Sequence, residues 1–233
     1  MYLSNLLKSF RKGLRTIYAQ FFSPLDRTKY GHIGTGSLIM NNSHLMPQNI
    51  YASDWSIIQN NLNFISNKGK LYLGKYSVIS SDCIIVPESH KLTVGVPFYL
   101  STIYHINDEV GNIIIEEDCW IGTGCILLPN CHIGRGVVVG AGSVVNKQIP
   151  PYAVVAGVPA KIIATKFSID EILKHEAILY TPEERMSKKE LESLFSSHYQ
   201  GLKSIGSNNQ DEDLMKYVNS IRNKIGMIDF SNL

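Results

Sequence analysis

Aliphatic residues return at every sixth position through the middle of the chain. The series runs through Leu73, Ile79 and Ile85 and resumes in the same phase at Ile115, Ile121, Leu127, Ile133, Val139 and Val145. A period of six fits neither a helix, which repeats at about 3.6, nor an amphipathic strand, which repeats at about 2. It is typical of a parallel β-solenoid, in which short strands stack coil upon coil around an aliphatic interior.

The fifth position of each six-residue repeat is usually small. The column contains Ser77, Cys83, Ser89, Cys119, Cys125, Cys131, Val137 and Ser143, with Ile149 as the exception. All four cysteines of the chain therefore share one column, and no C-x-x-C pair occurs. Four cysteines can indicate disulfides or a structural zinc site. Their common place in the repeat instead predicts small apolar fillers where the interior narrows.

Length and composition set broad limits. A chain of 233 residues suits one main domain with appendages, and 44% hydrophobic residues is ordinary for a globular protein. A net charge of +2 gives no indication of nucleic-acid binding. The sequence contains no apolar run of about 18 residues, as a membrane span would need, and no secretory signal core. We therefore expect a cytoplasmic protein.

Residues 1–28 form a separate unit that we predict to be a cationic amphipathic helix. Leucine, isoleucine and aromatic residues recur at helical spacing, and Lys8, Arg11, Lys12 and Arg15 lie among them. Two interpretations stay open. The helix covers one end of the solenoid, or residues 1–22 attach the protein peripherally to the anionic inner face of a membrane.

The rest of the chain divides into two predicted units. Residues 29–165 contain the coils, and a long loop at 86–112 interrupts them. Loops of this length inside a compact repeat are usually functional. After an extended exit, residues 166–233 are predicted to be helical. Their signals are two capping boxes, Ser168 to Glu171 and Thr181 to Glu184, and a last helix from Asp211 to Lys224.

Several motifs add to the repeat. They are Asp118-Cys119-Trp120-Ile121-Gly122, Pro129, Ile133-Gly134, Gly140-Ala141-Gly142-Ser143-Val144-Val145, Lys147, Ile149-Pro150-Pro151 and Gly157-Val158-Pro159-Ala160-Lys161. With them the chain resembles the hexapeptide-repeat acyltransferases over roughly residues 30–165. Within that family it looks most similar to the xenobiotic and polysaccharide O-acetyltransferase branch.

The resemblance implies a mainly β fold, a left-handed parallel β-helix with a protruding loop. The left hand comes from the family, because general sterics favour right-handed crossovers. The resemblance also implies a homotrimer that uses acetyl-CoA as co-substrate and requires no metal. In this branch a catalytic histidine opens a long excursion that contains a Pro-Phe pair, which corresponds here to His90 and Pro97-Phe98.

Acetyl transfer to a hydroxyl needs a base, and an imidazole with a pKa near ~6.5 suits that role. Among the seven histidines, His90 stands where a regular coil gives way to the loop. His105 within the loop is the reserve candidate. Glu88, or an aspartate from elsewhere, is expected to orient His90. In a trimer, His90 of one subunit would lie near the coenzyme-lined coils of its neighbour and act by direct transfer.

Five further residues correspond by position to coenzyme contacts. The resemblance implies that Trp120 walls the reactive end of the cofactor, that Thr123 and Ala141 contact the pantetheine arm, and that Lys147 and Lys161 face its phosphates. Ordinary coil packing is the alternative for Thr123 and Ala141. A solvated surface is the alternative for the two lysines.

The leading functional hypothesis is an O-acetyltransferase acting on a sugar hydroxyl of a surface polysaccharide or its precursor. The polar and aromatic loop, with Tyr99, Tyr104, His105, Asn107 and Asp108, motivates a glycan acceptor. The main alternative is an antibiotic (xenobiotic) acetyltransferase. A non-enzymatic scaffold is a further alternative.

A zinc carbonic-anhydrase-like solenoid would require three histidine ligands, two of them close in sequence. The nearest pairs, His32 with His44 and His90 with His105, do not supply such a cluster. We therefore expect no metal.

Overall fold

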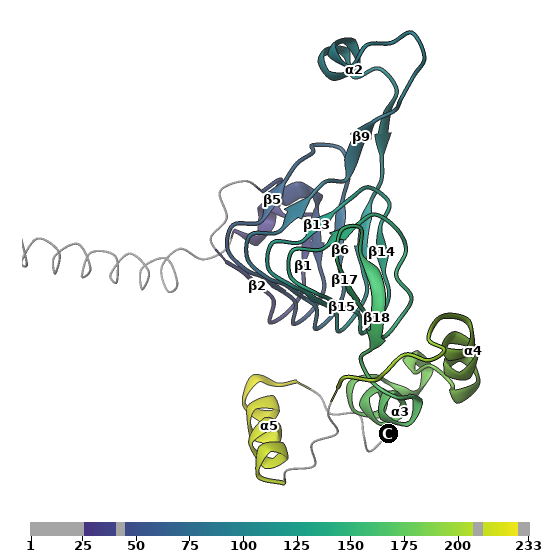
Figure 1. Cartoon of the computed structure of the whole chain (residues 1–233). Helices are drawn as coiled ribbons and strands as arrows, with labels where there is room; N and C mark the ends of the chain where they lie inside the picture. Colours follow the sequence, from purple (N-terminus) through teal and green to yellow (C-terminus); the bar gives the residue numbers. More distant parts are fainter. Residues whose placement is uncertain (1–25, 41–44, 207–211, 228–233) are drawn as a thin grey trace, which may run out of the picture.

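A computed structural model describes residues 26–40, 45–206 and 212–227. These residues form a left-handed parallel β-helix with three walls (Figure 1). In spatial order, the first wall contains β1 (His32–Ile33), β3 (Ile50–Ala52), β6 (Leu71–Leu73), β11 (Ile113–Ile115) and β14 (His132–Ile133). The third contains β16 (Val144–Val145), β13 (Ile126–Leu127), β8 (Ile84–Ile85) and β5 (Asn63–Phe64). The predicted fold class is confirmed.

The second wall is the longest and ends in an antiparallel hairpin. Its order is β18 (Lys161–Thr165), β17 (Ala153–Ala156), β15 (Val138–Val139), β12 (Trp120–Ile121), β7 (Val78–Ile79), β4 (Ile57–Ile58) and β2 (Leu38–Ile39). β17 continues the parallel stack on β15, and β18 then pairs with β17 in the opposite direction. The segment expected to be an extended exit from the coils is therefore a hairpin.

The aliphatic column is the core. Leu73 pairs with Ile115, which pairs in turn with Ile133 one coil further on. All nine aliphatic positions of the sequence series are at most 1% exposed. Burial of each such side chain contributes about 1.5–3 kcal/mol relative to exposure. The register therefore places one hydrophobic side chain per wall and per coil in a continuous interior.

The small column behaves as predicted with one exception. All four cysteines are buried and free, and burial raises the pKa of the Cys119 thiol to about 12, so this thiol stays protonated at neutral pH. Ser77 donates to the Glu116 carbonyl (2.6 Å) and accepts from the Cys119 N–H (2.9 Å), which ties two coils together. The placement of Ser89 in this column is wrong, because Ser89 is exposed on the excursion that leaves the coils.

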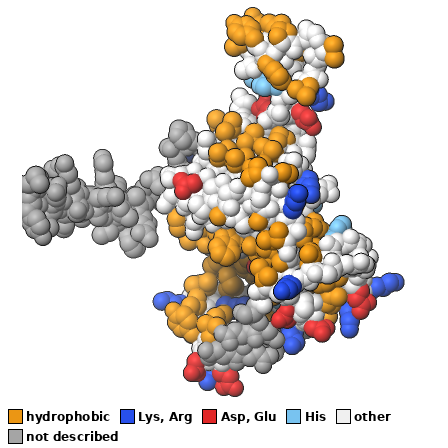
Figure 2. Space-filling model, in the orientation of Figure 1, with side chains coloured by type: hydrophobic (Ala, Val, Ile, Leu, Met, Phe, Trp, Pro, Cys, Tyr) orange, Lys and Arg blue, Asp and Glu red, His pale blue; other side chains and the backbone are white. Residues whose placement is uncertain are grey.

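The excursion at 86–112 is not an irregular loop. β9 (Glu88–His90) and β10 (Asp108–Val110) pair antiparallel and form a two-stranded ribbon. Between them in the chain, α2 (Phe98–Tyr104) lies at the far end of this ribbon (Figure 1). Apolar side chains gather on the outer part of the excursion (Figure 2). The exposed ones include Leu92, Val94, Phe98, Tyr99, Ile103 and Tyr104.

The C-terminal segment is helical as predicted. α3 (Ile169–Leu179) begins at the Ser168 capping box, and α4 (Lys188–His198) follows. The second predicted capping box is present, but it starts a short 3-10 helix, η3 (Pro182–Glu184). α5 (Glu212–Ile225) ends just before Gly226, whose φ of 74° is the left-handed value that favours glycine at a helix end.

The other described helical turns are η1 (Arg27–Lys29) and η2 (Pro47–Asn49). The predicted N-terminal helix and its membrane contact concern residues 1–28, of which 1–25 lie outside the described residues. Within the described part of the chain, no helix combines the length and the apolar character needed to cross a bilayer.

A buried carboxylate fastens α3 to the coils. The side chain of Glu176 is 1% exposed and accepts hydrogen bonds from the Tyr152 hydroxyl (2.7 Å), Arg135 (3.2 Å) and the Met186 N–H. Arg135 also donates to the Glu184 carbonyl (2.7 Å) and lies over the Tyr180 ring. Tyr152 and Arg135 belong to the coils, and Met186 lies just before α4. The carboxylate of α3 therefore links one corner of the coils to two helical segments.

We predict that Glu176→Gln lowers the free energy of unfolding by about 2–4 kcal/mol, because Arg135 then loses its buried counter-charge and keeps only the more exposed Glu117, 3.3 Å from its Nε. Urea unfolding followed by circular dichroism measures this change. Glu192→Gln, at an exposed position of α4, is the matched control and should change stability by less than about 0.5 kcal/mol. Equal stabilities for the two variants would contradict the role of Glu176.

Candidate active site

The candidate base stands on a ribbon with two anchored ends. The Val86 N–H still donates to Leu127 of the next coil (2.9 Å), so the coil is regular up to the point where β9 departs. The Gly111 N–H donates to the Pro87 carbonyl (2.8 Å), which closes the base of the ribbon. His90 is the last residue of β9, and a rigid scaffold therefore holds it at the edge of the coils.

A carboxylate orients His90. Asp108 is the cross-strand partner of His90, and its Oδ1 lies 2.7 Å from His90 Nδ1. A neutral imidazole whose Nδ1–H donates to a carboxylate carries its lone pair on Nε2. The His90 side chain is 32% exposed, against 5% for Asp108. The pair therefore combines a buried acceptor with an imidazole that a substrate can reach.

A second imidazole shares the same carboxylate. His105 follows α2 in the left-handed conformation (φ 52°), and its Nδ1 lies 2.8 Å from Asp108 Oδ2. The two rings are tilted, with centroids 6.5 Å apart. The structure thus brings both histidine candidates of the sequence to one aspartate.

Asp108 also meets a lysine from the coils. Lys68 Nζ lies 2.8 Å from Asp108 Oδ2 and 3.1 Å from Glu88 Oε1. The hydrogen bond from Lys68, with further ones from His90 and His105, holds the pKa of Asp108 well below its usual range. The carboxylate is therefore ionised at neutral pH, as an acceptor for imidazole N–H groups must be.

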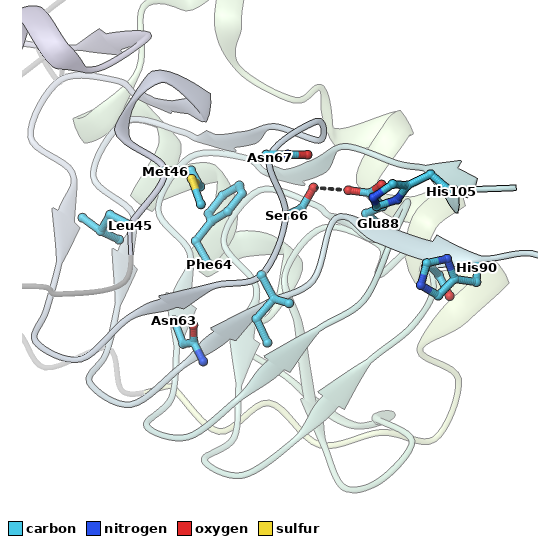
Figure 3. A pocket seen from close by; sticks show the side chains of 11 residues that line it. Leu45, Met46, Asn63, Phe64, Ser66, Asn67, Glu88, His90 and His105 are labelled. Carbon is cyan, nitrogen blue, oxygen red and sulfur yellow. Dashed lines mark hydrogen bonds between the residues drawn. The ribbon is translucent and has the colours of Figure 1, made fainter. Parts of the chain in front are cut away.

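An open groove of about 750 Å³ runs along the two histidines. Its lining consists of Leu45, Met46, Asn63, Phe64, Ile65, Ser66, Asn67, Glu88, Ser89, His90 and His105. Figure 3 shows apolar side chains toward one end and the imidazoles toward the other, with the Ser66 hydroxyl donating to Glu88 (2.7 Å). A ligand in this groove would therefore meet apolar side chains at one end and polar groups with the histidines at the other.

One cluster has donors suited to a cation. Ligand atoms of Glu88, His105 and Asp108 all lie within 4.8 Å of one another. The ammonium of Lys68 already contacts both carboxylates. This positive charge neutralises part of the negative charge that a metal ion would require, so the cluster fits an internal ion-pair network better than a metal centre.

The five residues expected to contact coenzyme lie elsewhere on the coils. Trp120 is 59% exposed on the second wall, and its Nε1–H donates to Ser80 (3.0 Å). Thr123 and Ala141 are exposed at the same corner of successive coils, where Gly142 N–H donates to the Thr123 carbonyl (2.9 Å). A Cβ on Gly122 would lie 2.6 Å from the Ala141 nitrogen, so this corner requires glycine for the coils to approach.

Lys147 and Lys161 are both exposed, the first just after β16 and the second at the start of β18. The described lining of the groove includes neither lysine, nor Trp120, Thr123 or Ala141. A single chain therefore presents two separate sets, the histidine groove and the coil surface with its lysines.

Sequence reasoning missed two residues of this site. In the sequence, Asp108 is one of several polar residues of the loop, and nothing there singles it out as the aspartate that orients His90. Reading 88–90 and 108–110 as a hairpin would have paired it with His90. Lys68 gave no signal, because it follows β5 by a few residues and reaches the ribbon only in three dimensions.

Known proteins share the repeat region. Residues 112–147 match the family model described as bacterial transferase hexapeptide (six repeats). This stretch contains β11 to β16, the coils that follow the excursion. Residues 112–147 of the chain are therefore hexapeptide repeats.

Curated relatives of this chain are acetyltransferases. It is 44% identical to a chloramphenicol acetyltransferase of Klebsiella aerogenes over 64 residues, which cover 28% of this chain and 30% of the relative. It is 34% identical to the galactoside O-acetyltransferase of Escherichia coli strain K12 over 117 residues, which cover 49% of this chain and 57% of the relative. The chain thus spans less than two thirds of either relative.

A solved structure has the same fold. A hexapeptide-repeat-containing acetyltransferase of Vibrio cholerae O1 biovar eltor, complexed with acetyl coenzyme A, superposes with a TM-score of 0.54 at 26% identity. The superposition covers 61% of this chain and 74% of that chain.

We predict that Asp108→Asn changes the tautomers of both histidines. An amide is a weaker acceptor than a carboxylate, so the preference for Nδ1–H at His90 and His105 should decrease. Nitrogen-15 NMR of the imidazole rings at a pH where they are neutral measures the tautomer ratio. Asp82→Asn, in a turn of the coils, is the control. Unchanged ratios in Asp108→Asn would contradict the shared-carboxylate arrangement.

Proposed function

We propose that this protein transfers the acetyl group of acetyl-CoA to a hydroxyl of a second substrate, with His90 as general base. The observation that carries the proposal is the His90–Asp108 pair, in which Nδ1 is bound to a buried carboxylate while the ring borders an open groove. The acetyltransferase relatives support the same chemistry.

The residues suggest direct transfer. His90 Nε2 accepts the proton of the acceptor hydroxyl as its oxygen attacks the thioester carbonyl carbon. The carbon–sulfur bond then breaks, and the imidazolium returns the proton to the departing thiolate. Asp108 stabilises the imidazolium through its ionised carboxylate, at 2.7 Å from Nδ1.

Acetyl-CoA is proposed to lie along the coil surface beside the second wall. Trp120, Thr123 and Ala141 are exposed, so their side chains and the neighbouring backbone are accessible to a pantetheine arm. Lys147 and Lys161 would attract its phosphates. Since these residues do not line the groove with His90 in one chain, we propose a homotrimer in which one subunit supplies the histidine and its neighbour the coenzyme surface.

The proposed acceptor is a sugar hydroxyl, most directly of a surface polysaccharide or its precursor. Asn63 and Asn67 line the groove and offer amide groups of the kind that bind sugar hydroxyls. The galactoside O-acetyltransferase relative supports this acceptor class.

An antibiotic acceptor is the second candidate. The groove also has an apolar end that includes Leu45, Met46 and Phe64, and one relative is a chloramphenicol acetyltransferase. Parallel assays with purified glycans and chloramphenicol distinguish the two classes.

We predict that His90→Gln lowers kcat for acetyl transfer by about 10²–10⁴-fold, the range expected for loss of a general base. Thiol release from acetyl-CoA, with mass spectrometry of the acetylated product, measures the rate. His32→Gln, at an exposed position of β1, is the control and should leave the rate unchanged. A folded His90→Gln variant with wild-type activity would indicate another base, and an inactive wild type on all acceptors would favour a scaffold.

A second prediction concerns the lysines. Lys147→Ala and Lys161→Ala should each raise the KM for acetyl-CoA about three- to tenfold with little change in kcat, since each removes roughly 1 kcal/mol of charge attraction. Steady-state kinetics at low salt measures this effect. Lys188→Ala, at an exposed position of α4, is the control. Unchanged KM in both variants would mean that these lysines belong to a solvated surface.

A further inference from the structure

We propose that Lys68 is a positioning residue for His90, acting as a fixed cation that holds Asp108 and Glu88 and thereby sets the protonation of the imidazole. This inference rests on the proposed function. Lys68 belongs to the coils, whereas Glu88 and Asp108 lie on the two strands of the ribbon. One ammonium therefore bridges both strands at the base of the excursion.

The coil corner that carries Lys68 is itself ordered around Ser66. Ser66 Oγ accepts from the N–H groups of Lys68 (3.0 Å) and Gly69 (3.3 Å) while it donates to Glu88 Oε2 (2.7 Å). Lys68 Nζ reaches the other oxygen of Glu88 (3.1 Å). Two side chains of this corner thus hold Glu88, one at each carboxylate oxygen.

The two carboxylate oxygens of Asp108 bind different partners, and this arrangement connects Lys68 to His90. Lys68 and His105 both bind Oδ2, at 2.8 Å each, so Oδ1 is left for His90 at 2.7 Å. The Asp108 side chain is 5% exposed, and rotation would break all three contacts at once. Lys68 therefore fixes the orientation of the carboxylate that orients the base.

The charges of the cluster indicate a second effect. The titratable groups that adjoin Asp108 are His90, His105, Lys68 and Glu88, and Lys68 contacts both carboxylates. With Lys68 present, one cation offsets two carboxylates. Without it, two anions would face the imidazoles and favour their protonated forms, which cannot act as a base.

The test is the pH dependence of kcat/KM in Lys68→Met. We expect the acidic limb to move upward by about one pH unit, so that kcat/KM measured on that limb falls about tenfold. Lys68→Arg keeps the charge and should restore the limb. Lys91→Met removes an exposed lysine next to His90 in the sequence and leaves the Lys68–Asp108 ion pair intact, so it should leave the profile unchanged.

A readout that needs no turnover separates this inference from the proposed function. The midpoint of the His90 imidazole titration, followed by NMR, should rise by about one pH unit in Lys68→Met and not in Lys91→Met. A profile and a midpoint equal to those of the wild type would overturn the role of Lys68. So would a loss of activity that is equal at all pH values and accompanied by a lower Tm. A shifted midpoint in an enzyme inactive on every acceptor would instead overturn the proposed function alone.

Discussion

The in-register stacking of parallel strands is the constraint on which the structure depends. Each coil donates backbone hydrogen bonds to the next, as in the pairing of Leu73 with Ile115 and of Ile115 with Ile133. A shift of one residue would turn the aliphatic column outward. The same register holds Gly122 against Ala141 and Ser77 between two coils. The surface groups of the coils, from Trp120 to the base of the ribbon, take their positions from that stacking.

Much of the coil architecture could be predicted because its cause is local. The six-residue period fixes which side chains point inward, and the cysteines of the small column are buried as their place in the repeat indicates. The excursion could not be predicted in the same way. Its strands carry no alternating apolar pattern, and they are held by pairs such as His90 with Asp108. Glu176 likewise gives no sequence signal, since its partners come from three separate segments.

The candidate site also contains residues that the sequence could predict and residues that it could not. His90 could be singled out because it stands where the repeat stops, a change that the sequence displays. Asp108 and Lys68 belong to the site through the folding of the ribbon onto one corner of the coils. In a site that joins a repetitive scaffold to an inserted ribbon, the sequence can therefore predict the base. The charged residues that contact the base are identified only from the three-dimensional structure.

The two ends of the excursion meet at one hydrogen bond, from Gly111 to Pro87. The chain leaves and re-enters the coils at a single corner, and the strands before and after the interruption stack as though nothing intervened. Natural variation can therefore lengthen, shorten or reshape the outer part of the ribbon while the scaffold stays untouched. Ligand choice depends on both parts, because the groove is lined by Phe64 of the coils as well as by His90 and His105 of the excursion.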